Sequence, residues 1–276
     1  VVINGLTCAV REPGPPVEIN TTHAYYQLFY RMLMLRLCRF CDIVFGVSPM
    51  HAAELASKSG VLSVHLWPPS VDEENFDPRR HVKSRELTRD KLLVSDKFVL
   101  IYHGVVSNER GLDELLQAIG LIRKQAPDVV LLILGTGYSA ERLRSVAIAN
   151  GLAGNVIFHG RVPYEEVPLF LAAADAGVIP LPVLPQWSTQ TPIKLLEYLA
   201  MEKPVILTET ESHKWIIGEE GHAFFCGKGT PEQLVKAILE CRARHVRPMR
   251  DDIVTRFSSK AIAGRVLTLL SQERGK

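Results

Sequence analysis

The chain has 276 residues, of which 47% are hydrophobic, so it can bury a substantial core in one large domain or two ordinary ones. Its 32 basic and 30 acidic residues leave a net charge of +2, which gives no electrostatic case for a nucleic-acid partner. Five scattered cysteines, an odd number, argue against a disulfide framework and fit a reducing cytoplasm.

The first part of the chain has an irregular pattern. We predict in order a loop over 11–22, a helix over 24–41, a strand over 42–47, a helix over 49–59 and a strand over 63–67. The pair Cys38 and Cys41 has the spacing of zinc ligands, but no second pair follows, so packing in a core is favoured. The arginines between Leu28 and Val47 leave two interpretations: a basic helix on a membrane surface, or the favoured helix packed on a core.

Residues 68–95 form a charged, polar connector, and we place a domain boundary there. From Phe98 onward, buried strands alternate with amphipathic helices. Strands are predicted at 98–102, 129–134, 155–159, 176–180, 205–207 and 223–226, and helices at 111–125, 139–150, 164–174, 192–202, 213–218, 231–242 and 259–272. This alternation predicts a doubly wound parallel sheet with an α/β fold, in which ligands bind beyond the carboxyl ends of the strands.

The segment from Thr191 to Val205 is the most informative part of the chain. We expect Pro192 in the first turn of a helix, with Thr191 or a polar residue before it as the N-cap. The free N–H groups of a helix N-terminus suit a phosphate, and Glu197, one turn further in, can accept hydrogen bonds from sugar hydroxyls. The combination suits a nucleoside diphosphate with its ribose.

Several motifs in this order resemble the group 1 (glycogen-synthase-like, retaining) glycosyltransferases, which have the GT-B fold of two Rossmann-like domains. The matching segments are 42–48, 69–78, His103-Gly104 with Glu109-Arg110-Gly111-Leu112, Leu134-Gly-Thr-Gly137, Phe158-His-Gly160 and Pro192-Ile-Lys-Leu-Leu-Glu197. The family's N-terminal strands and glycine-rich acceptor loop are not matched, so the resemblance implies an N-terminally truncated member.

The resemblance implies a role for each matched residue. Arg110 and Glu197 are the candidate catalytic residues, with Arg110 on the diphosphate and Glu197 on the donor ribose. The other implied donor-binding residues are Gly104, Gly137, Val162, Thr189, Thr191, Ile193 and Lys194. The sequence departs from the family where Thr189 replaces a second glutamate, which in the family contacts the donor sugar.

The domains implied are a partial N-terminal, acceptor-side domain at 1–70, a connector at 71–97, a nucleotide-sugar-binding domain at 98–255 and a C-terminal helix at 256–276. The reaction implied is transfer of a sugar from a UDP-sugar or GDP-sugar, with retention, to a saccharide or lipid-linked acceptor.

No cofactor is implied, and no metal, in agreement with the absence of an Asp-x-Asp motif. The location implied is the cytoplasm, with a peripheral contact at the inner face of the membrane left open.

Two other classes of function are compatible with parts of the sequence. A nucleotide-sugar-binding or partner module without turnover would explain Thr189 and the short first domain. A Rossmann-type oxidoreductase is disfavoured, because no strand is followed by G-x-G-x-x-G with an acidic residue after the next strand.

Overall fold

The computed structural model describes residues 2–4, 32–218, 223–244, 246 and 249–274. These residues form two compact units: Val1–Pro69 with Thr189–Thr191 make up unit 1, and Ser70–Ser188 with Pro192–Lys276 make up unit 2. The loop predicted at 11–22 and the first part of the helix predicted at 24–41 lie outside the described residues.

Unit 1 contains a small parallel sheet and its covering helices. The strands are β1 (Val2–Asn4), β2 (Ile43–Gly46) and β3 (His65–Leu66), in the order β1-β2-β3. Helix α2 (Pro49–Ser59) begins where the Ser48 side chain accepts a hydrogen bond from the His51 N–H at 3.0 Å. Residues 32–37 are helical and continue into a short 3-10 turn, Cys38–Phe40. Cys38 packs with Val44 and Leu55, as the core interpretation predicts.

Unit 2 is built on a six-stranded parallel sheet, which confirms the predicted doubly wound α/β fold. Its strands are β4 (Phe98–His103), β5 (Val129–Leu134), β6 (Val156–Gly160), β7 (Ala176–Ile179), β8 (Val205–Leu207) and β9 (Ala223–Phe225). They lie in the order β6-β5-β4-β7-β8-β9, so the chain changes direction across the sheet between β4 and β7. In such sheets the crevice at the switch point is where ligands bind.

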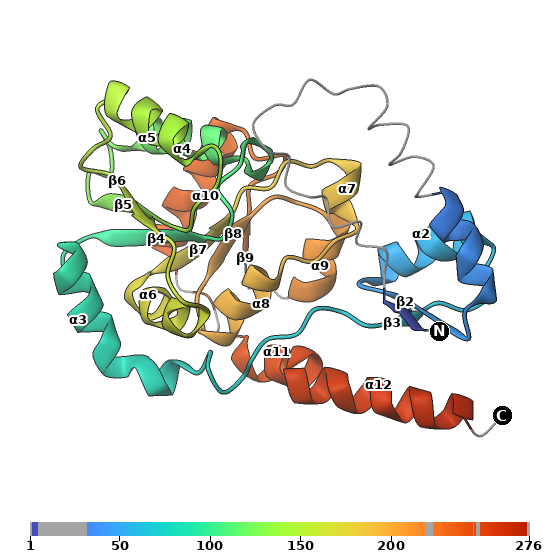
Figure 1. The fold of residues 1–276 in the computed structure, drawn as a ribbon. Helices are drawn as coiled ribbons and strands as arrows, with labels where there is room; N and C mark the ends of the chain where they lie inside the picture. The colour runs from blue at the N-terminus through green and yellow to red at the C-terminus, as the bar shows by residue number, and fades with distance from the viewer. Residues whose placement is uncertain (1, 5–31, 219–222, 245, 247–248, 275–276) are drawn as a thin grey trace. The chain divides into compact units, whose positions relative to one another are not determined.

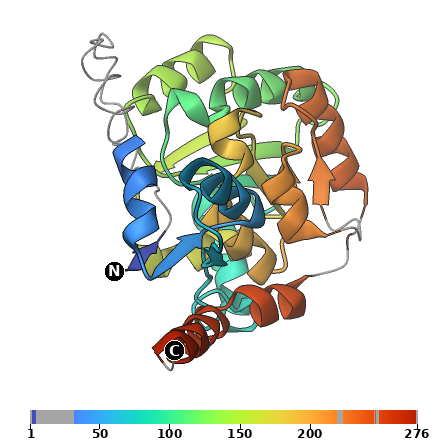
Figure 2. The ribbon, with the colours of Figure 1, turned by 90° about the vertical axis from the view of Figure 1, so that its right-hand side faces the viewer.

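Helices cover both faces of this sheet (Figure 1). The helices of this unit are α3 (Val82–Leu92), α4 (Leu112–Ile122), α5 (Ala140–Ala149), α6 (Val167–Ala173), α7 (Pro185–Ser188), α8 (Ile193–Ala200), α9 (Glu211–Ile217), α10 (Pro231–Ala243), α11 (Arg250–Phe257) and α12 (Ser259–Arg274). Short 3-10 turns lie at Pro78–His81, Asn108–Arg110 and Tyr164–Glu166. In both views, α4 and α5 (green) lie on one side of the strands, and α11 and α12 (red) on the other (Figures 1 and 2).

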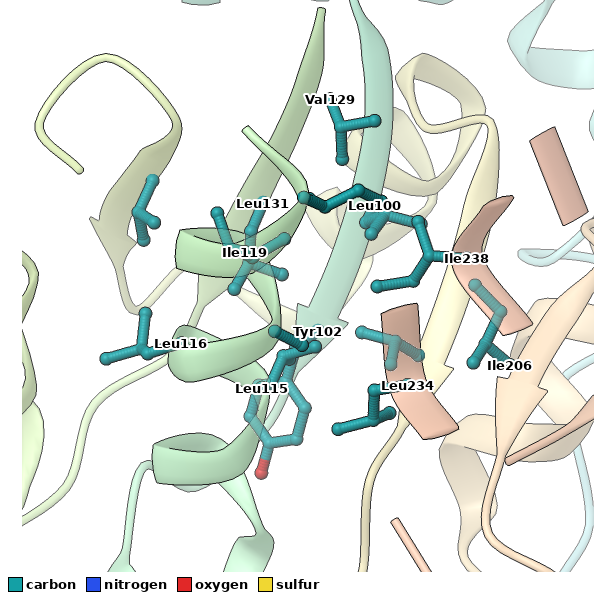
Figure 3. Packing of buried hydrophobic residues seen from close by; sticks show 14 of the residues in the cluster. Leu100, Tyr102, Leu115, Leu116, Ile119, Val129, Leu131, Ile206, Leu234 and Ile238 are labelled. Atoms are coloured by element: carbon teal, nitrogen blue, oxygen red, sulfur yellow. The ribbon is translucent and has the colours of Figure 1, made fainter. Parts of the chain in front are cut away.

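The main core lies between the sheet and the layer of α4 and α10. Figure 3 shows Leu115 and Ile119 of α4 and Ile238 of α10 pointing toward Leu100 and Leu131 of the central strands. All five side chains are fully buried. Because β4 and β5 are apolar on both faces, this packing holds the carboxyl ends of the strands in a fixed position.

Three helices were not predicted: α3, α7 and α11. The polar connector contains α3, which has few apolar residues but is held by two arginines. Arg85 Nη2 and Arg89 Nη1 lie 2.5 and 3.1 Å from the Asp175 carboxylate oxygens, and both side chains also donate to backbone carbonyls at the end of α6. Hydrophobic periodicity does not detect a helix that is held by ion pairs. The sequence of this segment therefore predicts a connector.

Candidate functional site

The loop after β4 borders the switch point, and the loop after β5 approaches it closely from the other side. Gly104 and Gly135 have φ values of 124° and 147°, which favour glycine, and a Cβ on Gly135 would lie 1.9 Å from the Gly104 carbonyl oxygen. A Cβ on Gly137 would lie 2.2 Å from the Val106 carbonyl oxygen. The glycines of both loops are therefore explained by backbone packing, which places the β5 loop directly against the β4 loop.

Arg110 lies in the loop that enters α4, and the neighbouring loop fastens it. Tyr138 Oη donates to the two carboxylate oxygens of Glu109 at 2.7 and 2.8 Å, and Ser139 Oγ donates to Asn108 Oδ1 at 2.6 Å. Burial alone would raise the pKa of Glu109, but the hydrogen bond from Tyr138 and others lower it overall, so the carboxylate stays charged. The loop thus presents Arg110 from a fixed backbone.

The Arg110 guanidinium stacks on an aromatic ring. Its Cζ lies 4.7 Å from the centre of the Trp187 ring, which belongs to the short helix α7. The Trp187 Nε1 atom is buried and has no hydrogen-bond partner in the described part of the chain. Trp187 therefore packs on the domain's own arginine, and its unpaired N–H remains available to an acceptor on a ligand.

Helix α8 begins without a side-chain cap, which corrects one prediction. Pro192 occupies the N-cap position with an extended ψ of 129°, so neither it nor Thr191 has the predicted place. A proline at the N-cap is tolerated because that residue needs no intrahelical N–H. Leu195 N donates back to the Pro192 carbonyl at 3.0 Å, while no side chain in the described part of the chain caps the N–H groups of Ile193 and Lys194. Two orphan donors therefore remain at this helix end.

Lys194, in the first turn of α8, lies beside the β4 loop. Its Nζ is 4.0 Å from the centre of the Tyr102 ring and 2.8 Å from the point that a Cβ on Gly104 would occupy. Although part of the residue reaches solvent, its ammonium is screened from water. Burial, with the nearby positive charge of Arg110, lowers the pKa of Lys194 to about 7. Two cations and an open helix N-terminus are thus gathered at one place.

Glu197 lies one turn further along α8 and is buried, with 2% of its surface exposed. Tyr164 Oη donates to Glu197 Oε1 at 2.8 Å. His103 Nε2 lies 3.1 Å from Glu197 Oε2, off the line of a well-aligned hydrogen bond. Burial lowers the pKa of His103 more than Glu197 raises it, so the imidazole stays neutral. The carboxylate is therefore held between β4, the loop after β6, and its own helix.

The structure brings together most of the residues that the sequence proposed. Arg110 and Lys194 interact electrostatically, as do Lys194 and Glu197, and Gly104 touches Lys194. Gly137 supports the loop of Arg110 through Val106, and Val162 lies half-buried in the loop between β6 and the turn of Tyr164. Thr189 and Thr191 belong to the three residues that group with unit 1.

Sequence reasoning missed the contact of Tyr164 with Glu197, because the two residues are 33 positions apart and Tyr164 reads as the start of a helix. The sequence left two interpretations of His103: a residue that contacts the ligand, or a buried structural residue of the loop. The available signal was that His103 ends one predicted strand and Tyr164 follows another strand of the same parallel sheet.

The described ranges contain neither a metal-binding cluster nor a membrane-crossing helix. No three His, Cys, Asp or Glu side chains there are arranged to hold a metal ion. None of the helices in those ranges combines the length and the apolar character that crossing a membrane requires.

Comparison with known proteins agrees with the fold and the motifs. The model of the family described as glycosyl transferases group 1 matches residues 84–255, more than half of the chain. This fold and this match define the class: the chain has the GT-B type of α/β architecture. It belongs to the group 1 glycosyltransferase family.

Particular relatives cover only parts of the chain. A GDP-mannose-dependent alpha-(1-6)-phosphatidylinositol monomannoside mannosyltransferase of Mycolicibacterium smegmatis is 31% identical over 152 residues, which are 54% of this chain and 39% of that enzyme. The crystal structure of Anabaena Alr3699/HepE in complex with UDP and glucose superposes with a TM-score of 0.74 at 18% identity, covering 87% of this chain and 67% of that one. Sucrose-phosphate synthase from Thermosynechococcus elongatus superposes with a TM-score of 0.73 at 20% identity, covering 90% and 61%. The chain thus spans about two fifths of the mannosyltransferase's length.

Proposed function

We propose that unit 2 binds a nucleotide-diphosphate sugar and that the protein transfers the sugar to an acceptor with retention at the anomeric carbon. The observation that carries this proposal is the meeting of Arg110, Lys194 and the uncapped start of α8 with the buried Glu197 carboxylate. Three sources of positive charge suit a diphosphate, and a carboxylate about one turn away suits the ribose hydroxyls.

The chemical demand of the transfer is stabilisation of the departing diphosphate. As the bond to the anomeric carbon breaks, negative charge grows on the diphosphate oxygens. The guanidinium of Arg110 and the N–H groups of Ile193 and Lys194 are fixed before the reaction, so they meet this charge without reorganising. Glu197 holds the ribose, and through it the position of the phosphates.

The donor and the acceptor are proposed from the relatives. The mannosyltransferase quoted above is described as GDP-mannose-dependent and as acting on a phosphatidylinositol mannoside, so GDP-mannose is the first donor to test and a lipid-linked saccharide the first acceptor. UDP-sugars are the second choice, because Alr3699/HepE was solved with UDP.

We further propose that the protein is cytoplasmic. Residues 98–255 bind the donor, and residues 1–70 face the acceptor. Residues 71–97 connect these two parts, and the C-terminal helix at 256–276 packs back.

The direct test of this proposal is donor binding followed by turnover. We expect calorimetry to detect binding of GDP-mannose or a UDP-sugar, and an assay of released nucleoside diphosphate to detect hydrolysis or transfer, with NMR reporting the anomeric configuration of the product. Glu197→Ala is expected to weaken donor binding. Binding without turnover would favour a nucleotide-sugar-binding module, which the threonine at position 189 supports, and absence of binding would reject both.

Donor binding is also expected to depend on pH through Lys194. A bound diphosphate raises the pKa of this amine above its free value of about 7, so binding takes up a proton. The lysine's contribution is complete below pH 7 and is lost as the pH rises toward the pKa of the complex. We expect the affinity for GDP-mannose to fall by up to about tenfold per pH unit between pH 7 and pH 9.

The variant Lys194→Met provides the control for this titration. It is expected to bind GDP-mannose more weakly at pH 7 and to show a flat profile up to pH 9. The diphosphate of GDP-mannose does not titrate in this range. A profile that stays steep in Lys194→Met would assign the dependence to another group.

A further inference from the structure

Two side chains from outside α8 contact the Glu197 carboxylate, and neither of them carries a charge. Tyr164 comes from the turn after β6, and His103 is the last residue of β4. Burial raises the pKa of the Tyr164 phenol, and the adjacent Glu197 raises it further, so the phenol keeps its proton. Each of the two carboxylate oxygens therefore faces one neutral group.

Tyr164 is itself fixed by a closed set of contacts. Its ring lies 5.4 Å from the ring of Phe76, which is fully buried. Arg250 donates to the carbonyl oxygen of Phe76 and, at 2.6 Å, to that of Ala200, the last residue of α8. The segment behind Tyr164 is therefore tied to the helix that carries Glu197, so the distance between phenol and carboxylate is set by the fold.

The remaining hydrogen-bonding capacity of the carboxylate defines what it can recognise. A carboxylate offers about four lone-pair positions on two oxygens. Tyr164 occupies one on Oε1, and His103 Nε2 lies 3.1 Å from Oε2, which leaves at least one acceptor position on each oxygen. Two acceptors on one rigid group match a pair of hydroxyls on adjacent carbons.

Resting on the proposed function, we propose that Tyr164 and His103 are positioning residues that lock the Glu197 carboxylate for the vicinal diol of the ribose. The lock makes the protein select ribonucleoside diphosphates over deoxy analogues. Without the phenol, the carboxylate can rotate about its side chain and water can compete for Oε1. The diol contact then weakens, while the contacts to the diphosphate at Arg110 and α8 are unchanged.

The test compares GDP with 2′,3′-dideoxy-GDP by calorimetry on the full chain, or UDP with its dideoxy analogue if UDP is the better ligand. We expect the unaltered protein to prefer the ribonucleotide by at least about tenfold, the effect of a hydrogen bond to a charged acceptor. Tyr164→Phe is expected to lose most of that preference by binding GDP about tenfold more weakly and the dideoxy analogue equally well. Because almost half of Tyr164 is exposed, the variant should fold.

Tyr138→Phe is the matched control, because that phenol also donates to a glutamate but supports the loop of Arg110. It should weaken both nucleotides by the same factor and keep the preference. His103→Leu should reproduce the selective loss seen in Tyr164→Phe. An equal loss for both nucleotides in Tyr164→Phe, or no preference in the unaltered protein, would overturn the inference while leaving the nucleotide site standing. Failure to bind any nucleotide would reject the proposed function itself.

Discussion

Arg110→Ala is expected to lower the rate of sugar transfer by about 10²–10³-fold, the usual effect of removing one fixed donor from developing negative charge. The guanidinium stacks on Trp187 and extends from a loop that the Tyr138 hydrogen bond holds in place. No free energy of reorganisation is therefore needed to position it when the reaction occurs. The measurement is kcat and kcat/KM with the donor that binds. Arg110→Lys keeps the charge but loses the planar fork, and it should recover only part of the rate.

Arg144→Ala is the matched control for this variant. Arg144 also stacks on an aromatic ring, with its Cζ 5.1 Å from the centre of Phe158, but it lies on the exposed surface of α5. We expect its removal to leave kcat/KM unchanged. If Arg110→Ala were as active as Arg144→Ala, the guanidinium would have no part in stabilising the leaving group.

Asp175→Ala is expected to lower the free energy of unfolding by about 3–5 kcal/mol, because it leaves the buried Arg89 and the partly exposed Arg85 without their counter-charge. Only 20% of the Asp175 side chain and 9% of that of Arg89 are exposed. The Asp175 carboxylate also accepts from the Val99 N–H at 2.7 Å, so its loss removes support from β4 as well as from α3. Urea denaturation at pH 7 measures the change.

The pH dependence of that stability follows from the pKa of Asp175. Burial raises the pKa, but the Val99 N–H and the two arginines outweigh burial and lower it. Its contribution is thus present above the ordinary pKa of an aspartate, about 4, and is lost as the pH falls through the depressed value. The variant should therefore lose less stability on acidification than the unaltered protein.

Asp128→Ala is the control for the stability loss in Asp175→Ala, because it removes a salt bridge at the surface instead of a buried one. Asp128 pairs with Arg242 at 2.9 Å, with 32% and 44% of the two side chains exposed. A pair at the surface contributes about 0–1 kcal/mol, so we expect a small change. Equal effects in the two aspartate variants would mean that α3 is not anchored through Asp175.

The regular part of the fold was predictable because its signals are local. The strands at Phe98 and Val129 are continuous apolar runs, and the helix from Leu112 has a single apolar face. The helix α3 escaped prediction, because its stability comes from Arg85 and Arg89 reaching a residue almost ninety positions away.

The candidate site was predictable to a similar degree. Glu197 was proposed from its place one turn into a helix, and Arg110 from the resemblance to the family, and the structure brings both near Lys194. The start of α8 was misplaced, since a sequence does not distinguish a proline at the N-cap from one in the first turn. The link from Tyr164 to Glu197 was not found, because Tyr164 lies in the turn after β6 and Glu197 lies in α8, which follows β7, a strand that is not a neighbour of β6 in the sheet.

The measurement that tests the central claim most directly is a crystal structure of the chain with GDP or UDP bound. We predict the diphosphate at the N–H groups of Ile193 and Lys194 and beside Arg110, with the ribose hydroxyls on Glu197. A nucleotide bound elsewhere, for example in the cavity of about 400 Å³ that Asp113, Gln117 and Glu232 help to line between α4, α5 and α10, would contradict this account.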